Sequence, residues 1–166
     1  MVPQVGMIGL TKVGGTVGKG IRVGQWLNGE GFKEWEHAFV LLPNGLLLEA
    51  EPGGAAIRPL HYSNVYWCTG LDKLIHPSVT PSEISRVAES LKGVKYSFLD
   101  YAALSAHRLH IPAPHLRAYI GDTGHMICSQ MADEFYLRLG AHIFTDNRWA
   151  GDVTPAGLYQ RDLQLR

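Results

Sequence analysis

Cys128 stands directly before a segment with helical spacing, in the stretch MICSQMADEFYLRLG that spans residues 126–140. A cysteine acts as a nucleophile in its thiolate form, which a helix N-terminus and a neighbouring histidine both favour. The preceding Gly-Asp-Thr-Gly, residues 121–124, predicts a loop, so the thiol is expected where unpaired backbone N–H groups point outward. Those groups could also hold an oxyanion. The same position equally suits a small apolar residue that only packs.

A partner base has to come from the eight histidines, and His37 is the strongest candidate. It begins an apolar segment after the polar residues 33–36, so its side chain could face a cleft at the end of a sheet. With a three-residue hairpin loop, His37 lies opposite Glu51, and Glu49 lies diagonal to it on the same face. A two-residue turn would put both glutamates on the other face. One register therefore supplies a carboxylate that can orient the imidazole.

The elements that must position these residues begin with a hairpin. Residues 37–51, HAFVLLPNGLLLEAE, predict two strands around a turn at Pro43, Asn44 and Gly45, because Asn and Gly tolerate positive φ. Residues 64–70 predict a third strand, in which Cys68 is expected to be a small buried hydrophobe. The glycine-rich segment 13–32 predicts a weak helix whose glycines do not fit a phosphate-loop spacing.

The rest of the chain favours helices. A capping box at Thr80 and Glu83 predicts a helix that continues to Gly93. Residues 97–110 predict a second helix, and the segment after Cys128 predicts a third that ends at Gly140. A last short helix is expected to begin at Thr154 and Pro155.

Size and composition predict one globular domain over residues 1–166, and the strands and helices expected along it make the domain α+β. Hydrophobic residues make up 46% of the chain and charged residues 18%, which is typical of a globular protein. Fifteen basic residues balance fifteen acidic ones without any basic run, so nucleic acid is not an expected partner. The N-terminus has no signal-peptide pattern and no apolar run approaches the about 20 residues of a membrane span, so we expect a cytoplasmic protein without stable membrane insertion.

Five short motifs follow one another along the chain: His37-Ala38-Phe39-Val40, Asn44-Gly45, Glu49-Ala50, Gly93-Val94-Lys95-Tyr96 and Cys128-Ser129. Their order and spacing resemble the circularly permuted papain-like hydrolases of the NlpC type, a group that includes relatives of lecithin:retinol acyltransferase. The resemblance covers roughly residues 5–160. It implies a papain-like fold in which an antiparallel sheet packs against helices and the histidine strand precedes the cysteine helix.

The resemblance also implies roles for individual residues. Cys128 becomes the nucleophile, His37 the general base and acid, and Glu49 the residue that orients the imidazole, with Glu51 as the alternate carboxylate. Tyr96 and Ser129 are expected to hold the oxyanion or to support the site. Unlike NlpC enzymes with an Asp-Cys-Ser-Gly motif, the chain has isoleucine before and glutamine after Cys128-Ser129. This difference leaves the mechanism intact and the peptidoglycan substrate open.

The expected activity is hydrolysis of an amide or ester bond through an acyl-thioester on Cys128, without a cofactor. The substrate could be a peptide, a peptidoglycan-like molecule or an acyl compound. Two alternatives stay open: a lipid acyltransferase or thioesterase, which predicts an apolar tunnel, and a catalytically idle binding module, which predicts an unreactive Cys128. No metal site is predicted, because four clustered histidines lack HExxH or CxxC spacing: His107, His110, His115 and His125.

Overall fold

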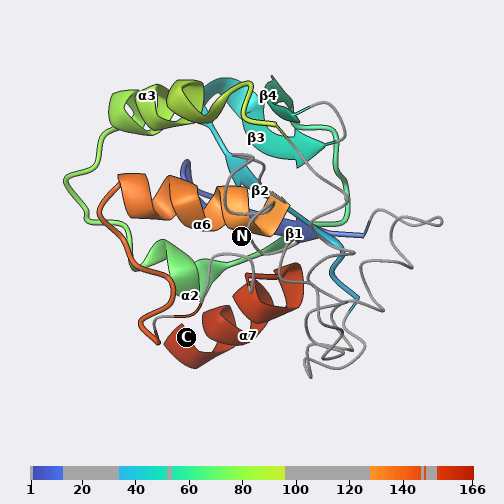
Figure 1. Ribbon diagram of the computed structural model, residues 1–166, viewed down its shortest axis with the longest axis vertical. Helices are drawn as coiled ribbons and strands as arrows, with labels where there is room; N and C mark the ends of the chain where they lie inside the picture. The colour runs from blue at the N-terminus through green and yellow to red at the C-terminus, as the bar shows by residue number, and fades with distance from the viewer. Residues whose placement is uncertain (1, 13–33, 52–53, 96–127, 147, 149–152) are drawn as a thin grey trace, which may run out of the picture.

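The structure of the protein is a computed structural model, and it describes residues 2–12, 34–51, 54–95, 128–146, 148 and 153–166. These residues form a five-stranded antiparallel sheet with helices packed on it (Figure 1). The strands lie in the order β4-β3-β2-β1-β5. Their bounds are β1 Ile8–Thr11, β2 His37–Leu41, β3 Leu46–Glu51, β4 Gly54–Pro59 and β5 Tyr66–Trp67. The α+β class expected from the sequence is therefore confirmed.

Helix α6 occupies the centre of the molecule and covers β2 and β3 (Figure 1). It lies between α3 on one side and α7 on the other, and α7 packs in turn against α2. Among the described residues, no helix has both the length and the apolar character that crossing a membrane requires. The bounds are α2 Thr69–Asp72, α3 Pro81–Leu91, α6 Cys128–Arg138 and α7 Pro155–Leu165, with a short 3-10 turn, η1, at Pro43–Gly45.

The β2–β3 hairpin has the three-residue loop that permits the favourable register. Asn44 and Gly45 adopt φ values of 60° and 69°, the left-handed conformation that these two residue types tolerate best. The turn sets Phe39 opposite Glu49. Since side chains alternate along a strand, Glu49 then shares a face of the sheet with His37, two residues before Phe39. The predicted hairpin and this register are both confirmed.

The capping box of α3 is also confirmed. The Thr80 hydroxyl accepts a hydrogen bond from the backbone N–H of Glu83 at 3.2 Å, and the Glu83 carboxylate accepts one from the backbone N–H of Thr80 at 2.8 Å. These bonds satisfy backbone donors that the first turn cannot pair within the helix. The buried face of the helix consists of Ile84, Val87, Ala88 and Leu91.

The predicted third strand over residues 64–70 is too long. The strand β5 ends at Trp67, Cys68 caps α2, and the chain is helical from Thr69. The cause lies far along the sequence: one carboxylate oxygen of Asp162 accepts hydrogen bonds from the backbone N–H groups of Gly70, at 2.6 Å, and Leu71, at 3.0 Å. A carboxylate in this position stabilises a helix start. Cys68 is nonetheless fully buried, as expected.

Of the remaining predicted helices, the one after Cys128 and the one after Thr154 are confirmed as α6 and α7. Gly140, with φ of 79°, follows the end of α6. The helices predicted over residues 13–32 and 97–110 lie outside the described residues.

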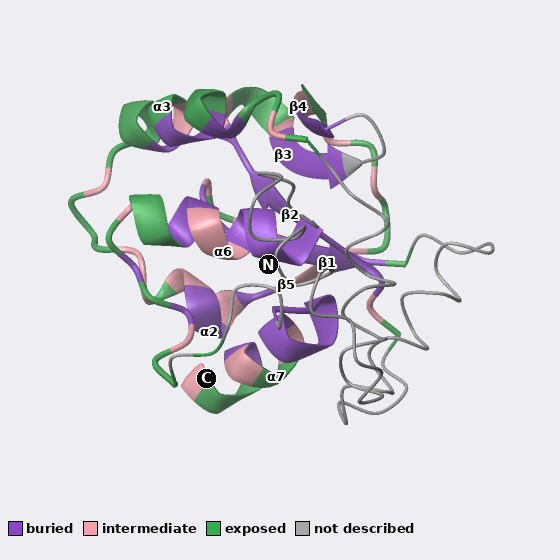
Figure 2. Ribbon diagram, viewed as in Figure 1, coloured by how far each residue is buried: buried purple, intermediate pink, exposed green. Residues whose placement is uncertain are grey.

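The core lies between the sheet and α6. In Figure 2, the strands β1 to β3 and most of α6 are buried, whereas α3 exposes its outer face. The core side chains of the sheet meet Met131, Phe135 and Tyr136 of α6, all of them fully buried. Burying large apolar and aromatic side chains is the main force that fixes a helix on a sheet. This packing therefore determines where the N-terminus of α6 lies relative to the sheet.

We expect Asp162→Ala to destabilise the protein by about 3 kcal/mol or more, because the buried carboxylate accepts bonds from Tyr66 and Arg166 as well as from the two backbone N–H groups of α2. Urea denaturation followed by circular dichroism measures this loss. The control is Asp146→Ala, which removes an exposed carboxylate paired with Arg148 and should leave the urea midpoint nearly unchanged. Equal effects of the two substitutions would contradict the role of Asp162.

Candidate active site

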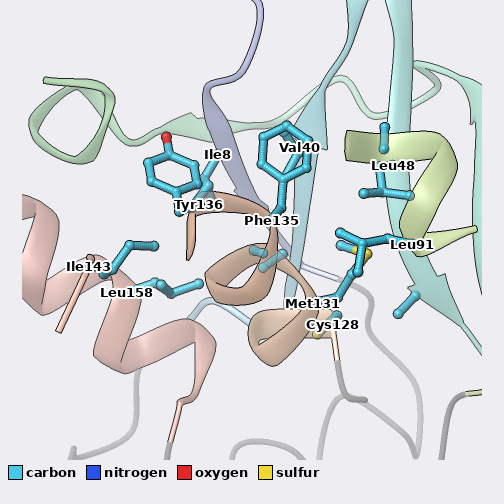
Figure 3. Packing of buried hydrophobic residues seen from close by; sticks show 14 of the residues in the cluster. Ile8, Val40, Leu48, Leu91, Cys128, Met131, Phe135, Tyr136, Ile143 and Leu158 are labelled. Atoms are coloured by element: carbon cyan, nitrogen blue, oxygen red, sulfur yellow. The ribbon is translucent and has the colours of Figure 1, made fainter. Parts of the chain in front are cut away.

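Cys128 is the first residue of α6, and its side chain is 1% exposed. Figure 3 shows it at the end of the helix, within the cluster of buried residues and close to Met131. The first turn is held in place by Ser129, whose hydroxyl donates a hydrogen bond of 2.7 Å to the carbonyl of Val153, just before α7. The thiol therefore sits at a helix N-terminus that packing and a buried hydrogen bond fix.

His37 is the first residue of β2, and its ring is in contact with both of the other predicted catalytic side chains. The ring lies next to Cys128, which contributes more than Glu49 to raising the pKa of His37. Its Nε2 atom lies 3.1 Å from Oε2 of Glu49. A carboxylate accepts only, so Nε2 carries a hydrogen and Nδ1 is the nitrogen left for the thiol. This arrangement allows Nδ1 to take and return the proton of Cys128.

Glu49 supplies the carboxylate from β3 and is completely buried. Its Oε2 accepts a second hydrogen bond, of 2.7 Å, from the hydroxyl of Tyr62, and its Oε1 lies 3.8 Å from Nε of Arg58. Burial by itself would raise the pKa of Glu49, but the hydrogen bonds from His37 and Tyr62 and the charges of His37 and His61 outweigh it. The pKa of Glu49 is therefore lowered, and the group stays ionised.

The electrostatics of His37 point the same way. Burial lowers the pKa of the ring, but electrostatic interaction and hydrogen bonding with Cys128 and then with Glu49 together raise that pKa to about 10. A protonated imidazole, paired with the ionised Glu49 and next to Cys128, is thus the favoured state near neutral pH. An imidazolium beside a thiolate is the arrangement that activates a cysteine for attack.

The structure brings three of the predicted residues together: Cys128, His37 and Glu49. The hydroxyl of Ser129 donates its hydrogen bond to the carbonyl of Val153, an interaction that supports the first turn of α6. Glu51 is the last residue of β3. Tyr96 lies outside the described residues.

Tyr62 was not predicted as a site residue, but its hydroxyl donates to Glu49 and its ring stacks on Phe39 with ring centroids 5.1 Å apart. Tyr62 belongs to the connection between β4 and β5, where no strand or helix periodicity indicates the direction of a side chain. Arg58 was missed too, although it lies on β4, beside the strand of Glu49. Arg58 could have been indicated only by predicting that β4 pairs with β3, the strand that carries Glu49.

No three His, Cys, Asp or Glu side chains within the described part of the chain are placed to bind one metal ion together. The four clustered histidines, His107, His110, His115 and His125, lie outside the described residues.

No protein-family model matches the chain, and no curated protein sequence matches it significantly. The chemistry of the site is therefore inferred from the residues and distances given above.

We expect the His37 ring to stay protonated at pH 8 and to lose its proton near pH 10, which ¹⁵N NMR of labelled histidine side chains measures. Because the pKa in the folded protein exceeds the ordinary 6.5, the protonated ring contributes stability that is complete below about pH 6.5 and is lost as the pH rises through about 10. Cys128→Ala removes the sulfur, one of the causes that raise the pKa of His37, and should lower that pKa. A ring that titrates near 6.5 in both proteins would contradict the contact.

Proposed function

We propose that the protein is a cysteine hydrolase that cleaves an amide or ester bond through an acyl-thioester on Cys128. The observation that supports this most is the buried chain of contacts from the Cys128 thiol to the His37 ring and on to the Glu49 carboxylate. Enzymes of nucleophilic acyl transfer commonly contain a nucleophile, a base and a group that orients the base, each in contact with the next.

In the proposed reaction, the Sγ atom of Cys128 attacks the carbonyl carbon while His37 holds the proton. Backbone N–H groups in the first turn of α6 have no acceptor within the helix and are suited to stabilise the oxyanion. His37 then protonates the leaving amine or alcohol, which departs and leaves an acyl-thioester. Next, His37 takes a proton from water, the hydroxide attacks the thioester, and the acid leaves as the proton returns to the thiol.

The order of the elements supports a permuted papain-like fold. The histidine strand β2 comes before the cysteine helix α6 in the chain, the glutamate strand β3 lies next to β2, and α6 packs on both strands. This is the arrangement that the resemblance to the NlpC-type hydrolases implies. Within that resemblance, the substrate is a peptide, a peptidoglycan-like molecule or an acyl compound, and Tyr96 is a further oxyanion donor.

A second candidate function, a catalytically idle binding module, is favoured by one observation: Cys128 is only 1% exposed. A substrate carbonyl has to reach the sulfur, so an idle module would leave the thiol unreactive. The contact between Cys128 and His37 favours the hydrolase, because a packing cysteine needs no histidine partner. The reactivity of the thiol separates the two functions.

We expect iodoacetamide to alkylate Cys128 faster than Cys68 below neutral pH, and His37→Ala to abolish the difference. Cys68 is a matched internal control because it is equally buried. Burial and the nearby charge of Asp162 raise its pKa, which Arg166 offsets in part, so Cys68 should stay a thiol. Peptide mass spectrometry gives both rates in one sample. If Cys128 and Cys68 are alkylated at equal rates, and His37→Ala does not change the rate at Cys128, the idle binding module is favoured.

We expect p-nitrophenyl acetate to transfer one acetyl group to the protein, with Cys128 as the modified residue in the intact-mass and peptide spectra. Cys128→Ala should abolish the acylation, and Cys68→Ala should retain it. Glu49→Gln should slow turnover about 100-fold or more, because an uncharged amide no longer stabilises the imidazolium. Acylation that persists in Cys128→Ala would rule out the proposed nucleophile.

A further inference from the structure

A groove with a volume of about 670 Å³ lies beside the proposed site. Its lining includes Thr11, which pairs with His37 in the sheet, and Trp35, two residues before His37. Tyr62 also lines it and donates its hydroxyl to Glu49. The groove therefore lies at the end of the sheet where β2 begins with His37.

Among the described lining residues of this groove, the acidic and the basic side chain form an ion pair, and His61 adds an imidazole. Nζ of Lys12 lies 2.7 Å from Oε2 of Glu34, so these two rim residues neutralise each other. The other described lining residues include neutral hydroxyl and amide groups, from Thr11, Ser63 and Asn64. The Thr11 hydroxyl already donates to the carbonyl of Asn64 at 3.3 Å. Ser63 and Asn64 are exposed, and a long alkyl chain would cover their polar side chains without supplying hydrogen bonds. An uncharged ligand with hydrogen-bonding groups is the better match.

Aromatic side chains form the apolar part of the same groove. Trp35 and Tyr66 pack together with ring centroids 5.3 Å apart, and Tyr62 supplies a third ring. Aromatic walls with a few polar groups are typical of small-ligand sites, in which the rings contact a flat apolar face and the polar groups fix its orientation. The groove thus suits a neutral amide that carries an aromatic or other flat apolar group.

Tyr62 joins this groove to the predicted catalytic residues. Its hydroxyl lies 2.7 Å from Oε2 of Glu49, the same oxygen that accepts from Nε2 of His37. Its ring stacks on Phe39 and lies 5.8 Å from the His37 ring, centroid to centroid. A ligand in the groove therefore touches the side chain that fixes the orienting carboxylate.

We propose that the groove binds an uncharged, hydrogen-bonding part of the substrate with a flat apolar group, and that Tyr62 is a positioning residue that holds Glu49 against His37. The inference rests on the proposed hydrolase function. Among the substrates open to that hydrolase, it favours an amide-like compound over a lipid acyl chain. Tyr62 acts through Glu49 and does not touch the reacting carbonyl.

The positioning role is tested with Tyr62→Phe, which removes one oxygen and keeps the ring on Phe39. Without the Tyr62 hydrogen bond, which lowers the pKa of Glu49, that pKa rises. When the rate of Cys128 alkylation is plotted against pH, its decline on the acid side should therefore begin at a higher pH. At pH 5 the rate should be about tenfold lower than in the wild type. The matched control is Tyr66→Phe, which removes the same oxygen in the same groove, where it bonds Asp162 instead. A decline that begins at the wild-type pH in Tyr62→Phe, or moves equally in Tyr66→Phe, would overturn the role.

The groove is tested by binding, which does not depend on turnover. N-acetylphenylalaninamide is titrated into the wild type and into Ser63→Trp, which fills the groove from an exposed position, by isothermal calorimetry. We expect binding at least about tenfold weaker in the variant, and weaker binding of decanamide than of the aromatic amide to the wild type. Asn64→Trp serves as a second blocking variant if the first does not fold.

The two proposals fail separately. Absent binding of the aromatic amide, or tighter binding of decanamide, overturns the groove assignment even when Cys128 is acylated. Unreactive Cys128 with intact binding overturns the hydrolase and leaves a binding groove.

Discussion

The buried hydrogen bond between His37 and Glu49 is the interaction on which the site depends. A carboxylate with no exposed surface is costly unless it is paired, and Glu49 is stabilised by the ring of His37 and the hydroxyl of Tyr62 on one oxygen. Because Nε2 is committed to Glu49, the other nitrogen of the ring is directed to Cys128. The orientation of the His37 ring follows from this contact, and its positive charge follows from Cys128 and Glu49 together.

The fold supplies the two elements that make the contact possible. The turn between β2 and β3 sets the register that puts Glu49 on the face of His37. Packing of α6 on the same two strands brings Cys128 to the ring. A shift of one residue in the hairpin would turn the carboxylate to the other face, so the left-handed turn at Asn44 and Gly45 matters as much as the residue types of the proposed site.

Two buried cysteines show how surroundings decide chemistry. Cys68 and Cys128 are almost equally inaccessible and both are free. Cys68 lies near the negative charge of Asp162, which disfavours a thiolate, whereas Cys128 lies against a protonated imidazole at the start of an eleven-residue helix. The proposed difference in reactivity therefore comes from neighbouring charge and not from exposure.

The sequence by itself determined the local elements. The hairpin turn, the capping box of α3 and the start of α7 follow from residue types only a few positions apart, since their hydrogen bonds close within one turn. His37 and Cys128 could be singled out because strand and helix starts are local signals as well. Only the tertiary structure decided what depends on distant segments: the bonds of Tyr62 to Glu49 and of Asp162 to α2, and the contact of Cys128 with His37. Each of these joins residues whose meeting depends on how the sheet and helices pack, which no local pattern specifies.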